Sequence, residues 1–218
     1  MKLLAVRMAR SIWLVPTYFL NPRGIFARPL FEAMKNRYSF LKAPLDDAVL
    51  QPSEGFKFEN GAFNGKDGAV IITSMTIFPD GFVVETRSST DDGDAFLEDA
   101  LNWISKEFGF ASPTELPFKK IYSSELNVSF QKAPAILNPK LVAFFKDVSS
   151  AISDESKGDA DILGFQLSTD YALSDKPAQF KFERELNVPY KENRYYSFAP
   201  TTTDAHITLL EKLEQLTT

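Results

Sequence analysis

Cysteine is absent from the 218 residues, and histidine occurs once, at position 206. Without cysteine the chain forms no disulfide, offers no thiolate nucleophile and builds no zinc or iron–sulfur site from thiolates. A single histidine also excludes metal sites and catalytic systems that need more than one imidazole. We therefore predict no catalytic residue, no metal site and no cofactor for this chain.

Long apolar runs and phosphate-binding loops are also missing. The opening stretch MKLLAVRMARSIWLVPTYFL is interrupted by Arg7 and Arg10 and then by Pro16, so it does not fit a signal peptide. No segment approaches the roughly 20 apolar residues of a membrane-spanning helix. The glycines of NGKDGA precede no helix, and they indicate a hairpin tip rather than a phosphate loop. We expect a soluble, cytoplasmic protein with no membrane partner.

The sequence has an ordinary composition but an uneven distribution of charge. Hydrophobic residues make up 44% and charged residues 24%, as in soluble globular proteins. Residues 1–45 hold eight basic side chains and one acid, whereas the remaining residues hold 16 basic and 28 acidic ones. The same N-terminal segment is rich in aromatic rings. This split predicts that residues 1–45 meet an acidic protein partner, a second copy of the chain, or the acidic remainder of the chain itself. Nucleic acid is an alternative partner that we do not favour, because a dedicated nucleic-acid binder is usually basic overall.

The first half predicts a strand, a helix and then an antiparallel meander. Residues 2–15 read as a strand that ends at Pro16, and IFARPLFEAMKNRY (25–38) reads as a helix. In FKFENGAF, Asn60-Gly61 lies between alternating apolar residues, which predicts a hairpin with a type I′ turn. A second hairpin is expected at Pro79-Asp80-Gly81. A helix follows, with its apolar face at residues 96, 97, 100, 101, 104 and 108 and its end at Gly109.

The second half repeats this mixture. ASPTELP (111–117) reads as a linker, residues 118–131 as a strand, and LNPKLVAFFKDVSSAIS (137–153) as a helix. Strands are expected within 162–172, 178–186 and 194–200, and a last helix from about Asp204 with Leu210, Leu213 and Leu216 facing inward. The prediction is an α+β fold of mainly antiparallel sheet with about four helices. The expected domains are two α+β halves, 1–110 and 111–218, with one continuous domain as the alternative.

A strand-to-helix junction occurs twice, as Ser89-Thr90-Asp91 and as Thr202-Thr203-Asp204. Duplication is one explanation, supported by FKFE at 56–59 and again at 180–183. Independent helix capping by Ser, Thr and Asp is the alternative that we favour, because these side chains accept the free N–H bonds of a first turn. The second junction could also bind an anion through Arg194, Thr203 and His206, since helix N-termini expose N–H donors.

Carboxylates that bind a metal ion are the remaining possibility for a catalytic site. STDDGD (Asp91, Asp92, Asp94) and DESKGDAD (154–161) could bind Mg²⁺ as in nucleases, and Glu183 and Glu185 lie beside Lys181 and Arg184. Because no nucleophile system or multi-histidine site accompanies them, we favour a non-enzymatic protein that binds other proteins within a larger assembly, of the kind found in phage, mobile-element or phage-defence systems. A carboxylate-based nuclease or other nucleic-acid enzyme is the alternative. The expected interaction residues are Arg7, Arg10, Trp13, Arg23, Arg28 and Arg37.

Overall fold

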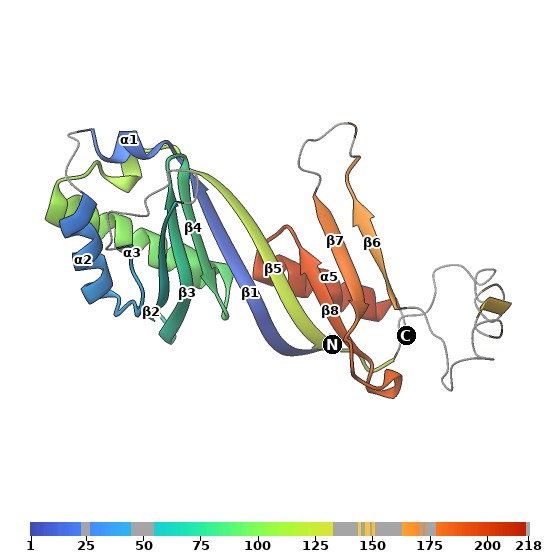
Figure 1. Cartoon of the computed structure of the whole chain (residues 1–218). Helices are drawn as coiled ribbons and strands as arrows, with labels where there is room; N and C mark the ends of the chain where they lie inside the picture. The colour runs from blue at the N-terminus through green and yellow to red at the C-terminus, as the bar shows by residue number, and fades with distance from the viewer. Residues whose placement is uncertain are drawn as a thin grey trace. The chain divides into compact units, whose positions relative to one another are not determined.

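The computed structural model describes residues 1–22, 27–44, 55–132, 144, 147–148, 150, 163–170, 172 and 178–216. These residues form the α+β fold of mainly antiparallel sheet that the sequence predicts (Figure 1). The elements of the first half are β1 (Lys2–Leu14), α1 (Thr17–Leu20), α2 (Ala27–Arg37), β2 (Phe56–Gly65), β3 (Gly68–Phe78), β4 (Gly81–Thr86) and α3 (Thr90–Phe108). Those of the second half are η2 (Pro113–Glu115), β5 (Lys119–Ser129), β6 (Gly164–Ser168), β7 (Gln179–Arg184), η3 (Tyr190–Glu192), β8 (Arg194–Ala199) and α5 (Thr203–Gln215).

The described chain divides into two compact units. One unit holds Val6–Glu125 and Pro200–His206; the other holds Met1–Ala5, Leu126–Ala199 and Ile207–Thr218. We call them the α3 unit and the α5 unit after their main helices. Strands follow the order β2-β3-β4-β1-β5 in the α3 unit and β5-β8-β7-β6 in the α5 unit, because β1 and β5 contribute residues to both. The expected division into 1–110 and 111–218 stays a prediction.

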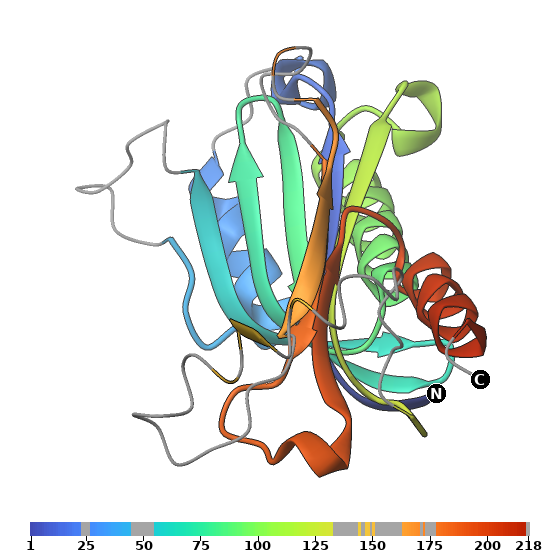
Figure 2. The same ribbon diagram turned by 90° about the vertical axis from the view of Figure 1, so that its right-hand side faces the viewer.

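The strands β2, β3 and β4 form the meander expected from the sequence, and they lie side by side in Figures 1 and 2. The turn between β3 and β4 falls at Pro79-Asp80, as predicted. The first hairpin differs from the expectation, because β2 runs straight through Asn60-Gly61 and turns only after Gly65, where Gly65 pairs with Gly68. A Cβ on Gly61 would lie 2.5 Å from the ring of Phe40, so this glycine serves close packing rather than a turn.

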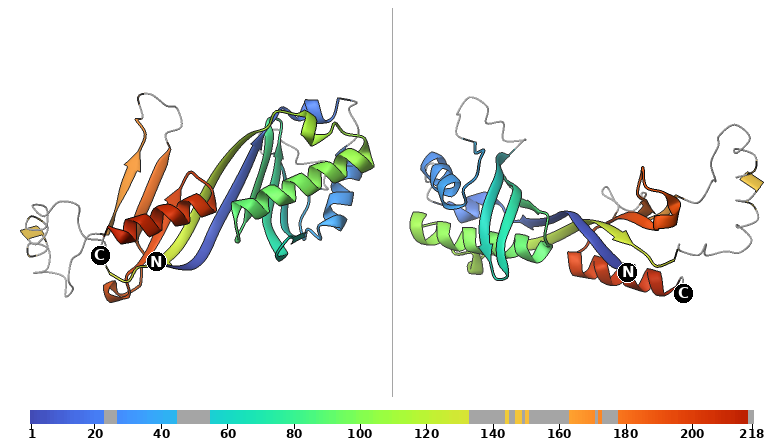
Figure 3. Two further views of the ribbon diagram at one scale, coloured as in Figure 1. Left: turned by 180° about the vertical axis from the view of Figure 1, so that it is seen from behind. Right: turned by 90° about the horizontal axis from the view of Figure 1, so that it is seen from below.

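Both ends of helix α3 are set by capping residues next to them in the sequence. Ser89 is extended and caps its first turn, two carboxylates lie in that turn, and Gly109 ends it in the left-handed conformation at φ 67°. One face of the helix is buried, and its residues join the core of the α3 unit together with aromatic residues of α2 and β2. Figure 3 shows α2 and α3 on the same side of the meander. The sheet therefore has one covered face in this unit.

Two connections differ from the sequence prediction. Residues 17–20 form the short helix α1, where only the strand end at Pro16 and a turn were expected. The segment 111–117 is not a linker, because the Ala111 N–H donates to the Leu20 carbonyl at 2.9 Å and Leu116 packs against the core. A proline-rich composition predicts an irregular backbone, but it does not reveal that apolar side chains fix the segment to a neighbouring helix.

The α5 unit is built around aromatic rings on β7 and β8 and the ring of Phe130, the residue that follows β5. Phe182 stacks on Tyr195 with centroids 4.6 Å apart, and Phe130 lies 5.4 Å from each of them. Helix α5 lies behind β7 and β8 in Figure 1 and in front of them in the reverse view of Figure 3. Leu210 is fully buried, whereas Leu216 is exposed and does not face inward as expected. The helix predicted at 137–153 lies largely outside the described residues.

None of the helices in the described ranges is long and apolar enough to cross a bilayer.

Candidate functional site

The two repeated junctions are capped in the same way. Ser89 Oγ accepts a hydrogen bond from the Asp92 N–H at 3.0 Å, and Thr202 Oγ1 accepts one from the Ala205 N–H at 3.4 Å. Each cap therefore satisfies an N–H group of the first turn three residues later, which is the usual geometry of an N-cap. Neither Thr203 nor Asp204 fills this position, although the sequence pattern suggested them.

The residues that follow the caps bind each other. The Thr90 N–H donates to Thr203 Oγ1, and the Thr203 N–H donates to Thr90 Oγ1, both at 3.1 Å. Both threonines are buried, and all four atoms belong to the α3 unit. Each helix start thus supplies the hydroxyl that satisfies a backbone donor of the other. The sequence shows the repetition but gives no sign that its two copies meet.

Buried polar side chains continue from this pair into the central strands. Ser11 Oγ on β1 donates to the Thr90 carbonyl at 2.9 Å, and Ser124 Oγ on β5 lies 2.8 Å from Nδ1 of His206. Ser11, Ser124 and His206 are all fully buried. Burial lowers the pKa of His206 to about 4, because the charged imidazolium loses its hydration. The imidazole is therefore neutral at pH 7, and this cluster serves to satisfy buried polar groups.

The three residues proposed to bind an anion occupy different surroundings. Thr203 and His206 belong to the buried cluster just described, and their hydroxyl and ring nitrogen are already hydrogen-bonded. Arg194 lies in the α5 unit, where its guanidinium is 2.9 Å from a carboxylate oxygen of Glu185. Anion binding at this junction stays a prediction, and helix capping accounts for the contacts of the two buried residues.

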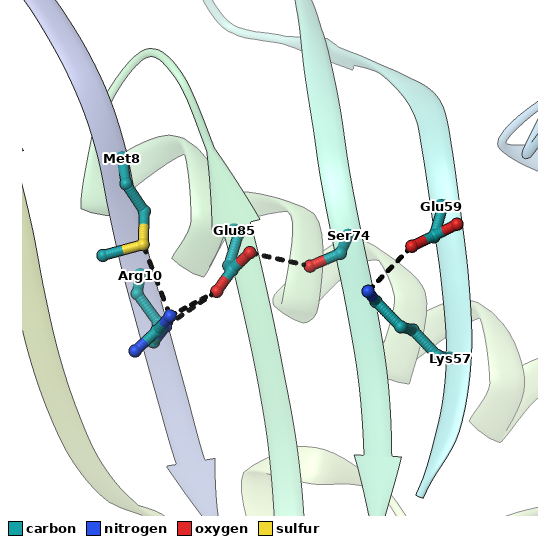
Figure 4. A network of polar contacts seen from close by, with 6 residues as sticks. All are labelled: Met8, Arg10, Lys57, Glu59, Ser74 and Glu85. Carbon is teal, nitrogen blue, oxygen red and sulfur yellow. Dashed lines mark hydrogen bonds and ion pairs between the residues drawn. The ribbon is translucent and has the colours of Figure 1, made fainter. Parts of the chain in front are cut away.

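Most of the predicted interaction arginines have acidic neighbours within their own unit. On the open face of the sheet, Arg10 Nε donates to Glu85 at 2.9 Å, and Glu85 in turn accepts from Ser74 (Figure 4). Arg37 is 3.1 Å from Asp99, and Arg28 is 3.6 Å from Glu32 one turn along α2. Arg7 is exposed on β1, and Arg23 lies outside the described residues. The Arg28–Glu32 pair is exposed, and pairs of that kind contribute little to stability, about 0–1 kcal/mol.

Trp13 is buried, and a network of polar contacts within its own unit holds its side chain. Its Nε1–H donates to Asp94 at 2.7 Å, and Lys120 Nζ lies 3.8 Å from the centre of its ring. Asp94 also accepts from Tyr122 Oη at 2.8 Å, and burial together with this carboxylate raises the pKa of Tyr122. One indole, one ammonium and one phenol thus converge on a single carboxylate. With 3% of its surface exposed, Trp13 acts as a core residue.

The carboxylates of STDDGD do not gather around a common point. Asp92 accepts from its own cap Ser89, and Asp94 binds the Trp13 network. Burial and then the neighbouring carboxylates of Asp204, Asp94 and Asp92 raise the pKa of Asp91. Across the described part of the chain, no group of three or more His, Cys, Asp or Glu side chains could hold a metal ion. DESKGDAD lies outside that part, and Glu183 pairs with Lys181 at 2.8 Å on β7.

The surface around α1 belongs to the aromatic N-terminal segment noted in the sequence, although Tyr18 and Phe19 were not among the predicted interaction residues. Tyr18 and Phe19 are 66% and 48% exposed, and their rings contact each other with centroids 4.4 Å apart. One side of α1 borders a hollow of about 290 Å³ and the other a pocket of about 340 Å³. Leu14, Val15, Pro16, Phe19, Asp80 and Pro117 line the hollow. The sequence signal is a pair of adjacent aromatic residues, Tyr18 and Phe19, separated from Pro16 by Thr17.

No protein-family model matches the chain, and no curated protein matches its sequence.

Proposed function

We propose that this protein is a non-enzymatic component of a larger assembly, and that it binds a separate protein through the surface around α1. The exposed Tyr18–Phe19 pair carries this proposal. Large aromatic side chains on short rigid segments are the residues that protein interfaces use as anchors. Their neighbours Leu14, Val15 and Pro16 extend the apolar area into the adjoining hollow.

The pairing of the N-terminal cations changes the kind of partner that is expected. The charge asymmetry of the sequence suggested an acidic partner, but Arg10, Arg28 and Arg37 have carboxylates beside them already. An acidic partner would have to displace these pairs and would gain little from each of them. An apolar segment of another protein instead gains the burial of two exposed rings, at roughly 25 cal/mol per Å².

The test compares a double substitution on α1 with a single control substitution on β3. Tyr18→Ser with Phe19→Ser removes the anchor rings, and Ile71→Ser removes another exposed apolar side chain of the same unit, on β3 at 67% exposure. Partners recovered from the native host by cross-linking should be lost with the α1 variant and kept with the β3 variant. Equal recovery by both variants would contradict the proposal.

Light scattering adds a second readout. If the surface binds another protein, the purified chain keeps one molar mass over a wide concentration range. A concentration-dependent dimer that the Tyr18→Ser, Phe19→Ser variant abolishes would show that the occupant is a second copy of the chain instead. Reversal of Arg10 and Arg37 to Glu should leave partner recovery within about twofold, because an apolar contact responds weakly to peripheral charge.

A further inference from the structure

The pocket on the other side of α1 differs from a surface hollow because it enters the core. It lies in the α3 unit and has a volume of about 340 Å³. Its walls come from both layers of the unit, namely α2 and α3 on one side and β2, β3 and β4 on the other. Leu30, Phe82, Leu101 and Ile104 line it and are at most 6% exposed, so their side chains belong to the core itself.

The chemistry of the walls is uniform. The lining consists of aliphatic and aromatic side chains, with Thr17 and Asn21 as the polar members. Tyr18 is the most exposed lining residue, so α1 marks the side that opens to solvent. Among the lining residues that the structure describes, none carries a charged side chain. A charged group placed inside would lose its hydration without a counter-charge, which is strongly unfavourable.

The volume fits a small molecule. An apolar cavity of about 150 Å³ already accepts benzene, and natural ligand pockets begin at about 300 Å³. We infer that this pocket binds a neutral, largely apolar small molecule of about ten to fourteen non-hydrogen atoms, of the size of a bicyclic aromatic or a ten-carbon chain. Its apolar body contacts the core side chains, and a small uncharged polar group remains at Thr17 and Asn21.

The first measurement uses 2-naphthol and 2-naphthoate, which share one ring system but differ in charge at pH 7. Isothermal titration of the purified full chain should give saturable binding of 2-naphthol, with a dissociation constant on the order of 100 μM or tighter. The carboxylate should bind at least tenfold more weakly, because no charged lining side chain compensates it. No saturable binding of 2-naphthol, or equal binding of both probes, would overturn the inference.

Substitutions in the pocket walls then test whether 2-naphthol binds in this pocket. Ile104→Phe on α3 and Leu30→Phe on α2 add bulk from two different walls, whereas Ile71→Phe makes the same change on the exposed side of β3. Each wall variant should lower the affinity for 2-naphthol at least tenfold, and Ile71→Phe should leave it within twofold. A cavity of this size has room for the added atoms, so both wall variants should fold. If both fail to fold, or if both bind like the wild type, the pocket is not the binding site.

Discussion

The β4–α3 junction and the β8–α5 junction share one spacing along the chain, and the fourth residue of their helices shows an instructive difference. β4 and β8 have equal lengths, and their first and last residues are all 113 positions apart, as are Thr90 and Thr203 and the serines Ser11 and Ser124. At the fourth residue of each helix, α3 has Gly93 and α5 has His206. A Cβ on Gly93 would lie 2.8 Å from Ser11 Oγ, whereas His206 reaches Ser124 with a ring nitrogen at 2.8 Å.

This difference reflects the distance between each helix start and the serine on the strand beside it. In the α3 copy the helix backbone approaches the central strand so closely that only glycine fits without displacement. In the α5 copy an imidazole fills the corresponding place and supplies the polar partner for the serine. The constant spacing and the reciprocal threonine bonds are the features that bear on the choice between duplication and independent capping, and independent capping stays our prediction. The FKFE match does not contribute, because its copies lie on β2 and β7, which occupy different places in their meanders.

The largest expected effect tests whether the two helices contribute equally to stability. Leu97 and Leu210 are equivalent positions 113 residues apart, and both are fully buried. Leu97→Ala and Leu210→Ala should each lower the free energy of unfolding by about 2–5 kcal/mol, through lost transfer energy and the cavity left behind. Urea denaturation of both variants measures this, with Leu209→Ala as the exposed control. A Leu210→Ala variant as stable as the wild type would break the equivalence.

A smaller effect is the pH dependence of the free energy of unfolding. It distinguishes the two junctions, because only the β8–α5 junction contains a histidine. The pKa of His206 is near 6.5 in the unfolded chain and about 4 in the folded one. Between these values the unfolded state binds the proton, so stability is fully present above pH 6.5 and falls as the pH decreases toward 4. The expected loss is roughly 3 kcal/mol, since one pKa unit corresponds to about 1.4 kcal/mol.

The measurement is the pH dependence of the free energy of unfolding for the wild type and for His206→Gln. Carboxylates titrate in the same range in both proteins, so the difference between the two curves isolates the histidine. The glutamine variant should show a flatter curve between pH 6.5 and 4. Parallel curves would mean that His206 is not buried in its neutral form.

The smallest effect concerns the reciprocal threonines. Thr90→Val and Thr203→Val each remove one hydroxyl and leave one buried N–H without its acceptor, at a cost of about 1–3 kcal/mol. Each variant removes a different bond, but the two residues are in contact, so the loss in the double variant should differ from the sum of the single losses by about 0.5 kcal/mol or more. A double-mutant cycle in urea measures this coupling. Strictly additive losses would show that the two helix starts do not depend on each other.

Features that depend on neighbours in the sequence were predicted well. The meander, the turn at Pro79-Asp80, the buried face of α3 and its end at Gly109 all follow from alternation, helical periodicity and capping. Features that depend on distant residues were not. Asn60-Gly61 has the sequence of a hairpin turn, yet the ring of Phe40 requires a glycine in the middle of β2. The pocket and the exposed rings at α1 were missed for the same reason.

The sequence by itself determined the α+β class, the absence of thiol chemistry and the composition of two similar helix starts. A helix cap is decided within about four residues, so these features are readable without a fold. Only the tertiary structure decided that the two starts bind each other, that Trp13 is fixed by Asp94, and that Arg10 and Arg37 have acidic partners. Such contacts join residues about 60 to 110 positions apart, and they form only after the sheet and its helices have packed together.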